Sequence, residues 1–236
     1  MWRPQVGVLA ANGWRVIAPD LRGYGESTLT SGAFAFEDFG TDLLVLLDEL
    51  GIERFVVGGL SMGGQIAMEV CRQAPERVRG LLLAATFPQS ESEQGKIRRN
   101  DMADRLLREG MAGYAAEVLP KMVGARCLRE NPAIGEAVLE MMTKTDPRAA
   151  AAALRARALR RPYEPVLAGF GRPATVVVGD EDAFTTRDDA MKMASLLADC
   201  DLRWMPGVGH MPNLEQTDSF NAALLGLLER VRATGG

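Results

Sequence analysis

The sequence has few of the side chains that metal sites and disulfide frameworks need. Its 236 residues include one histidine, His210, and three cysteines far apart in the chain. A single imidazole excludes histidine-rich metal sites, and three scattered cysteines make neither a disulfide framework nor a ligand cluster. We therefore expect no bound metal, no cofactor and a reduced, cytoplasmic protein.

Two further signals are missing from the charge balance and the hydrophobic pattern. Acidic residues outnumber basic residues by 31 to 27, which gives a formal net charge of -4 at pH 7. Such a chain has no general electrostatic attraction to nucleic acid or to an anionic membrane. The apolar patch near the N-terminus is far shorter than the ~20 residues of a membrane span. We expect neither nucleic acid nor a membrane as a partner.

The sequence does contain an alternation of strand-like and helix-like segments. Hydrophobic residues make up 47% and charged residues 25% of the chain, which excludes a disordered protein. Strands are predicted over residues 14–19, 54–59, 78–85, 174–178 and 202–205. Helices are predicted to end at residue 11 and to span residues 36–50, 62–74, 187–197 and 218–231. This alternation predicts an α/β fold with a mostly parallel central sheet flanked by helices.

The middle of the chain departs from this alternation. From about residue 88 to residue 165 the apolar spacing is helical, with no strand-like run. We predict a discontinuous α/β core of residues 1–87 and 166–236, interrupted by an all-helical insertion of residues 88–165. An arginine run from Arg148 to Arg161 has no acidic residue within it. It is interpreted as a solvated helix face, with capture of an anionic substrate or partner as the alternative.

One motif combines a serine with glycines at a predicted strand-to-helix turn. Residues 59–63 read Gly-Leu-Ser-Met-Gly, so that Ser61 follows one strand and precedes one helix. A serine hydroxyl is a poor nucleophile unless it lies beside a base and its oxyanion is stabilised, and a sharp strand-to-helix turn provides that geometry. Ser61 is the candidate nucleophile. A structural glycine-serine turn is the alternative.

Candidates for an acid and a base follow two later strands. Asp180, Glu181 and Asp182 come directly after the strand at 174–178, where open α/β sheets place their sites. A carboxylate there can orient an imidazole, and His210 lies in a glycine-flanked loop after the last strand. The order serine, acid, histidine distinguishes one known triad arrangement from the others. The sequence therefore predicts a triad in which three acids compete for one role.

These motifs resemble those of α/β-hydrolase fold enzymes over about residues 1–232. The Gly-Leu-Ser-Met-Gly-Gly elbow and the closing Gly-His-Met-Pro-Asn-Leu-Glu segment are similar to those of 3-oxoadipate enol-lactonases, cofactor-free haloperoxidases and related esterases. The resemblance implies Ser61 as nucleophile, His210 as base and Asp182 as acid, because the family's acid commonly stands in a G-x-x-D turn. It also implies that the helical insertion is a cap that covers the pocket and sets specificity.

The same resemblance predicts segments that the sequence does not contain. Members of the family carry three strands and a His-Gly loop before the region that residues 1–5 match, and that loop supplies half of the oxyanion hole. We expect that the chain is an N-terminally incomplete reading of a longer gene, with Met1 an internal methionine. The backbone N–H of Met62 is then the expected oxyanion donor.

Together these features predict a serine hydrolase that cleaves a small carboxylic ester or lactone through an acyl-enzyme intermediate. A haloperoxidase-like perhydrolase on the same triad is one alternative. A non-catalytic α/β-hydrolase-like ligand-binding protein is another. Leu60, beside the nucleophile, and Trp204, before the histidine loop, are candidate substrate-binding residues, with packing as the alternative for Trp204.

Overall fold

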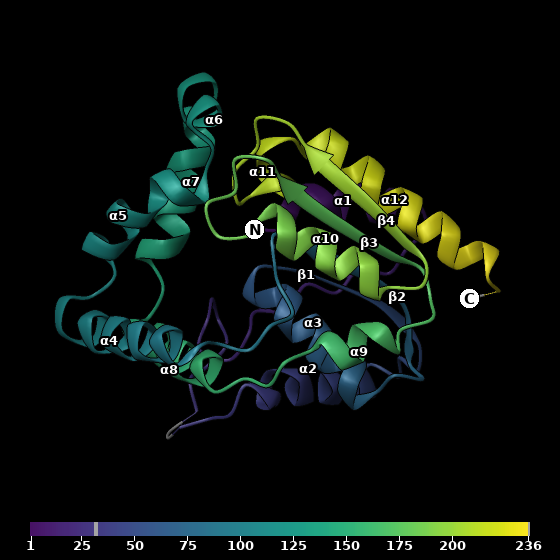
Figure 1. Cartoon of the computed structure of the whole chain (residues 1–236), viewed down its shortest axis with the longest axis horizontal. Helices are drawn as coiled ribbons and strands as arrows, with labels where there is room; N and C mark the ends of the chain where they lie inside the picture. The colour runs from purple at the N-terminus through teal and green to yellow at the C-terminus, as the bar shows by residue number, and fades with distance from the viewer. Residues whose placement is uncertain (31–32, 236) are drawn as a thin grey trace.

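A computed structural model gives the positions of residues 1–30 and 33–235, in which a parallel sheet packs between helices (Figure 1). The sheet order is β1-β2-β3-β4, and every neighbouring pair is parallel. The strands are β1 (Phe55–Leu60), β2 (Val78–Ala84), β3 (Ala174–Gly179) and β4 (Cys200–Met205). The α/β fold predicted from the alternation of segments is confirmed.

Helices cover both faces of this sheet. One face packs against α2 (Glu37–Glu49), α3 (Met62–Gln73), α9 (Glu164–Ala168) and α10 (Arg187–Leu196). The other face packs against α1 (Arg3–Ala11), α11 (Pro212–Glu215) and α12 (Thr217–Ala233). In β3, Val176 and Val178 enter the first core and Val177 enters the second, because successive side chains of a strand point to opposite faces. A strand covered on both faces is apolar throughout.

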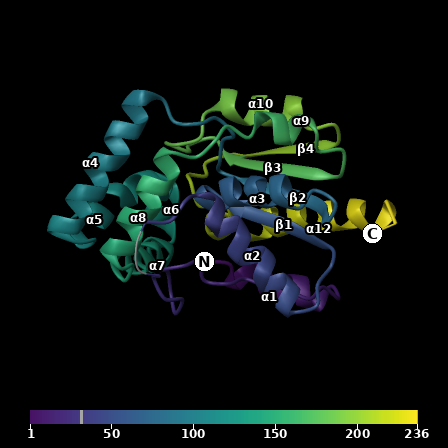
Figure 2. The ribbon, with the colours of Figure 1, turned by 90° about the horizontal axis from the view of Figure 1, so that it is seen from below.

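The chain between β2 and β3 forms a helical lobe. Its helices are α4 (Glu93–Glu109), α5 (Ala112–Met122), α6 (Ala125–Glu130), α7 (Pro132–Thr143) and α8 (Pro147–Ala158). Figures 1 and 2 show this lobe, the cap, beside the end of the sheet to which the strand arrows point. By α9 the chain has returned to the core, where it packs against α3 and α10. Within the described residues, no helix has the length and apolarity needed to cross a bilayer.

The strand predicted over residues 14–19 is wrong. This segment has no regular secondary structure, and β1 lies at the edge of the sheet. A strand requires a hydrogen-bonded neighbour, and among the described residues no strand pairs with β1 on the side away from β2. Trp14 instead packs against the core around α12, with the guanidinium of Arg232 4.9 Å from the centroid of its ring.

Candidate active site

Ser61 joins the end of β1 to the start of α3 in a conformation that few residues adopt. Its φ and ψ are 55° and -116°. A Cβ on Gly59 would lie 2.0 Å from the backbone of Gly63, so the turn accepts only glycine there. A Cβ on Gly64 would lie 2.6 Å from the methyl group of Thr86. The tight turn and the half-buried serine are the geometry of a nucleophile elbow.

Hydrogen bonds hold the elbow on both sides. The Ser61 N–H donates to the carbonyl of Ala84 at 2.8 Å, and Thr86 Oγ1 donates to the Ser61 carbonyl at 2.8 Å. The Met62 N–H, at the first position of α3, has no acceptor among the described residues. The first N–H groups of a helix lack partners within the helix, so this donor is available to a negative charge that develops next to Ser61.

His210 and Asp182 form the central contact of the site. Nδ1 of His210 lies 2.9 Å from both carboxylate oxygens of Asp182. The two side chains are 3% and 0% exposed. Asp182 Oδ1 also accepts the N–H groups of Phe184 and Thr185 at 2.8 and 3.2 Å. A carboxylate at Nδ1 keeps the ring proton there, which leaves a lone pair on Nε2.

The two competing acids lie elsewhere. Asp180 is exposed and accepts the N–H of Gly207 at 2.7 Å, while Glu181 is exposed and donates its own N–H to the Val208 carbonyl at 3.0 Å. Of the three acids, Asp182 is the one that meets the histidine. No hydrogen bond joins the histidine to the Ser61 hydroxyl among the described residues, and such bonds are often long before a substrate binds.

Phe184 is a site residue that the sequence motifs do not reveal. Its ring packs edge-on against the His210 ring, with centroids 4.7 Å apart and an interplanar angle of 62°. Phe184 lies two residues after Asp182 and is partly exposed. The one sequence feature that could have indicated Phe184 is its place as an aromatic residue in the loop that carries Asp182. The Phe184 ring is therefore in direct contact with the imidazole.

Glu215 ties the histidine loop to the cap. Its Oε2 accepts the N–H groups of Gly124 and Gly209 at 2.9 and 3.0 Å, and its Oε1 accepts the N–H of Met211 at 3.0 Å. The histidine's own backbone N–H donates to the carbonyl of Met122 at 3.1 Å. The motif around His210 contains this glutamate but does not indicate its role, because its cap partner is distant in the chain.

The arginine run is not a solvated face throughout, so that prediction is wrong for two of its members. Arg160 is 2% exposed and donates to Glu91 at 2.8 Å. Arg157 is half-buried, and its Nε donates to Oε1 of Gln65 at 2.9 Å. Gln65 lies one turn after Ser61 on α3, so this contact between the cap and the core is close to the proposed nucleophile.

Leu60 and Trp204 have the contacts of packing residues. Leu60 is 5% exposed and belongs to the core beneath α12. Trp204 packs in the core on the opposite face of the sheet, and the guanidinium of Arg187 lies 5.6 Å from the centroid of its ring. For Trp204 this matches the packing alternative rather than a place in a substrate pocket.

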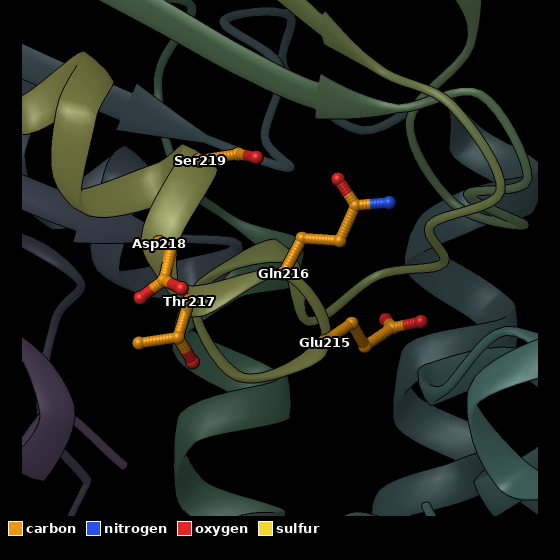
Figure 3. A pocket seen from close by; sticks show the side chains of 5 residues that line it. All are labelled: Glu215, Gln216, Thr217, Asp218 and Ser219. Atoms are coloured by element: carbon orange, nitrogen blue, oxygen red, sulfur yellow. The ribbon is translucent and has the colours of Figure 1, made fainter. Parts of the chain in front are cut away.

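The described structure has a hollow beside α11 and another in the cap. One, of about 340 Å³, is lined by Glu215 to Ser219, whose side chains point in different directions (Figure 3). The other, of about 250 Å³, lies among α4, α5 and α8 of the cap. Its lining residues are Glu91, Gly95, Arg98, Arg99, Met102, Tyr114 and Leu154. The described residues hold no cluster of three His, Cys, Asp or Glu side chains suited to a metal ion.

Known hydrolases share this fold over nearly the whole chain. The 3-oxoadipate enol-lactonase 1 of Acinetobacter baylyi is 25% identical over 232 residues, which are 98% of this chain and 85% of that protein. A thermophilic esterase from Thermogutta terrifontis, solved with malate bound, matches with a TM-score of 0.93 and 32% identity over 98% of this chain and 85% of that chain. The enol-lactonase of Burkholderia xenovorans LB400 matches with a TM-score of 0.88 and 27% identity, over 97% and 85% of the two chains.

The match to a family as a whole covers almost the same residues. A model described as the alpha/beta hydrolase family matches residues 1–223. That range includes the elbow, the buried Asp182–His210 pair and the helical cap. The chain therefore belongs to the alpha/beta hydrolase family and is a hydrolase.

Proposed function

We propose that this enzyme hydrolyses a small carboxylic ester or lactone, with Ser61 as nucleophile, His210 as base and Asp182 as the acid that orients the base. The observation that carries the proposal is the buried contact between Asp182 and Nδ1 of His210. The strained elbow at Ser61 supports it. The relatives described above, an esterase and two enol-lactonases, support the same substrate class.

The reaction proceeds in two halves. Ser61 Oγ attacks the substrate carbonyl carbon while Nε2 of His210 takes the hydroxyl proton, and the imidazolium then gives that proton to the leaving alkoxide. In the second half, water loses a proton to His210 and attacks the acyl carbon, and Ser61 leaves with that proton. Asp182 stays ionised and stabilises the imidazolium in both halves. The Met62 N–H donates to the oxyanion, a contribution of roughly 10²–10³ in rate for one donor.

The alternative of a perhydrolase uses the same three residues, with hydrogen peroxide in place of water as the second nucleophile. It stays a prediction, which peroxide-dependent halide oxidation in acetate tests. The alternative of a binding protein without catalysis predicts that Ser61 does not react with an acylating or phosphonylating reagent.

The test is the reactivity of Ser61. A fluorophosphonate probe should label the wild-type protein at Ser61, and Ser61→Ala should lose the label together with p-nitrophenyl acetate hydrolysis, by about 10⁴-fold or more. Ser219→Ala is the matched control, because this exposed serine lines the hollow of Figure 3. Full activity in Ser61→Ala, or loss of activity in Ser219→Ala, would contradict the assignment.

A further inference from the structure

The cap holds more positive charge than its carboxylates neutralise. Glu91 Oε1 accepts from Arg99 at 2.6 Å and from Arg160 at 2.8 Å, so one acid serves two guanidinium groups. Arg157 is the third guanidinium of this cluster. No carboxylate in the described part of the chain lies within 4.0 Å of it. The cluster therefore has an excess positive charge at Arg157.

The surroundings of Arg157 make this excess charge unfavourable. The side chain is half-buried, and its one hydrogen-bond partner among the described residues is the neutral amide oxygen of Gln65. Burial, together with the charges of Arg99 and Arg160, lowers the pKa of Arg157 to about 9. A buried cation without a counter-charge destabilises a protein. An anion placed beside Arg157 would remove this penalty.

The position of Arg157 connects the cap to the reaction centre. Leu154, one turn earlier on α8, lines the cap hollow of about 250 Å³ together with Tyr114. Gln65, which holds Nε of Arg157, lies one turn after Ser61 on α3. Residues one turn apart on a helix have Cβ atoms about 5–6 Å from each other. One helical turn and one side-chain hydrogen bond therefore connect the elbow to the guanidinium.

We propose that Arg157, held by Gln65, is the subsite for a carboxylate of the substrate, whose ester or lactone carbonyl is attacked by Ser61. This inference rests on the proposed function and names its substrate class, for which the half-esters of short dicarboxylic acids are the simplest examples. With Nε committed to Gln65, the terminal nitrogens of the guanidinium are left to donate to the carboxylate, which is a charge-assisted contact.

The experiment compares two esters of equal length. Monoethyl glutarate carries a carboxylate where ethyl valerate carries a methyl group, and acid release is followed for both. The wild-type kcat/KM should favour monoethyl glutarate by roughly 10- to 100-fold, the worth of a hydrogen bond to a charged group. Arg157→Gln should remove that preference, so that the kcat/KM values for the two esters become nearly equal.

Matched variants separate this effect from a loss of structure. Arg155→Gln removes an exposed guanidinium from the same helix, one that pairs with Asp104 at 2.5 Å, and should keep the wild-type preference. Arg157→Lys keeps the charge and loses the planar fork, so it should retain part of the preference. If Arg157→Gln does not fold, a loss in Arg157→Lys that is confined to monoethyl glutarate supports the subsite, and an equal loss on both esters overturns it.

The outcomes distinguish the subsite from the proposed function. If Ser61 is labelled and both esters are hydrolysed equally well, the subsite is overturned and the proposed function stands. If Arg157→Gln lowers both activities by the same factor, the guanidinium only holds the cap, and the subsite is again overturned. If neither ester is hydrolysed and Ser61 is not labelled, the proposed function fails. The subsite is then tested by calorimetry with glutarate. If the subsite exists, glutarate binds to the wild-type protein and binds more weakly to Arg157→Gln.

Discussion

A buried charged side chain in the core and a half-buried one in the cap have opposite surroundings. Glu69 on α3 is 0% exposed and accepts hydrogen bonds from Arg72, Gln73 and Tyr163. Arg157 on α8 has a neutral amide as its hydrogen-bond partner within the described chain. A buried charge with a complete set of fixed partners belongs to the stability of the fold, whereas one without a counter-charge is available to a ligand. Glu69 in the core has fixed partners, whereas Arg157 in the cap has no counter-charge within the described chain.

The largest expected effect on activity is that of a change at Asp182. Asp182 is a core carboxylate with fixed partners, and it also contacts the proposed base. Asp182→Asn should lower kcat by about 10⁴-fold, since an amide no longer holds the proton on Nδ1 of His210. Ester hydrolysis and thermal unfolding are measured together. Asp180→Asn, in the same turn but bonded to Gly207, should keep near wild-type activity. A loss of stability without a loss of rate would show that Asp182 is only structural.

Glu215 lies between the two regions and should have the next effect. Glu215→Gln leaves one acceptor oxygen for the three N–H groups of Gly124, Gly209 and Met211. We expect kcat to fall by roughly 10-fold, the rate equivalent of one such hydrogen bond, with KM unchanged. The rate of fluorophosphonate labelling of Ser61 should fall with it, which a role in stability alone would not produce. Asp218→Asn, at an exposed neighbouring position, is the control.

Glu69 should have the smallest effect on activity and a clear effect on stability. Burial raises the pKa of Glu69, but hydrogen bonds from Arg72, Gln73 and Tyr163 outweigh burial and hold the pKa below its ordinary value of 4.5. A lowered carboxyl pKa stabilises the fold above the unfolded pKa, and this stabilisation is lost as the pH falls through the folded value. Glu69→Gln should therefore destabilise the protein by about 2 kcal/mol at pH 7.

The pH dependence of unfolding is the measurement for Glu69. The difference in melting temperature between wild type and Glu69→Gln should shrink as the pH is lowered below about 4. The preference between monoethyl glutarate and ethyl valerate should stay at the wild-type value. A changed preference in Glu69→Gln would contradict this distinction between Glu69 and Arg157, because a carboxylate with a complete set of partners would then control specificity.

Local patterns in the sequence were sufficient for most of the sheet and for the elbow. The strand around Val176 is rich in β-branched residues, and Ser61 stands between a strand pattern and a helix pattern, so neither assignment depends on distant residues. The segment at 14–19 has the same apolar pattern and forms no strand, because a strand also requires a neighbour. The pattern describes a segment's tendency and does not supply that neighbour.

The arginines of α8 show what a count of charges omits. Ala153 and Ala156 are buried. Arg157 lies four residues after Ala153, and Arg160 lies four residues after Ala156. Residues four apart share a helix face, but Ala151 is also buried while Arg155, four residues after it, is exposed. The alanine spacing alone therefore does not distinguish the arginines that face inward. The carboxylate of Glu91 and the amide of Gln65 come from other parts of the chain. Their contacts with the arginines could therefore not be read from the run itself.

The backbone conformation of Ser61, the proposed nucleophile, lowers the stability of the fold. At φ 55° and ψ -116° a residue with a Cβ carries about 1–3 kcal/mol of strain that glycine would avoid. The whole free energy of unfolding of a domain is about 5–15 kcal/mol, so a sizeable share of the stability margin is forgone at one residue. The most stable version of this fold would have no hydroxyl at position 61, and the reactive version is the less stable one.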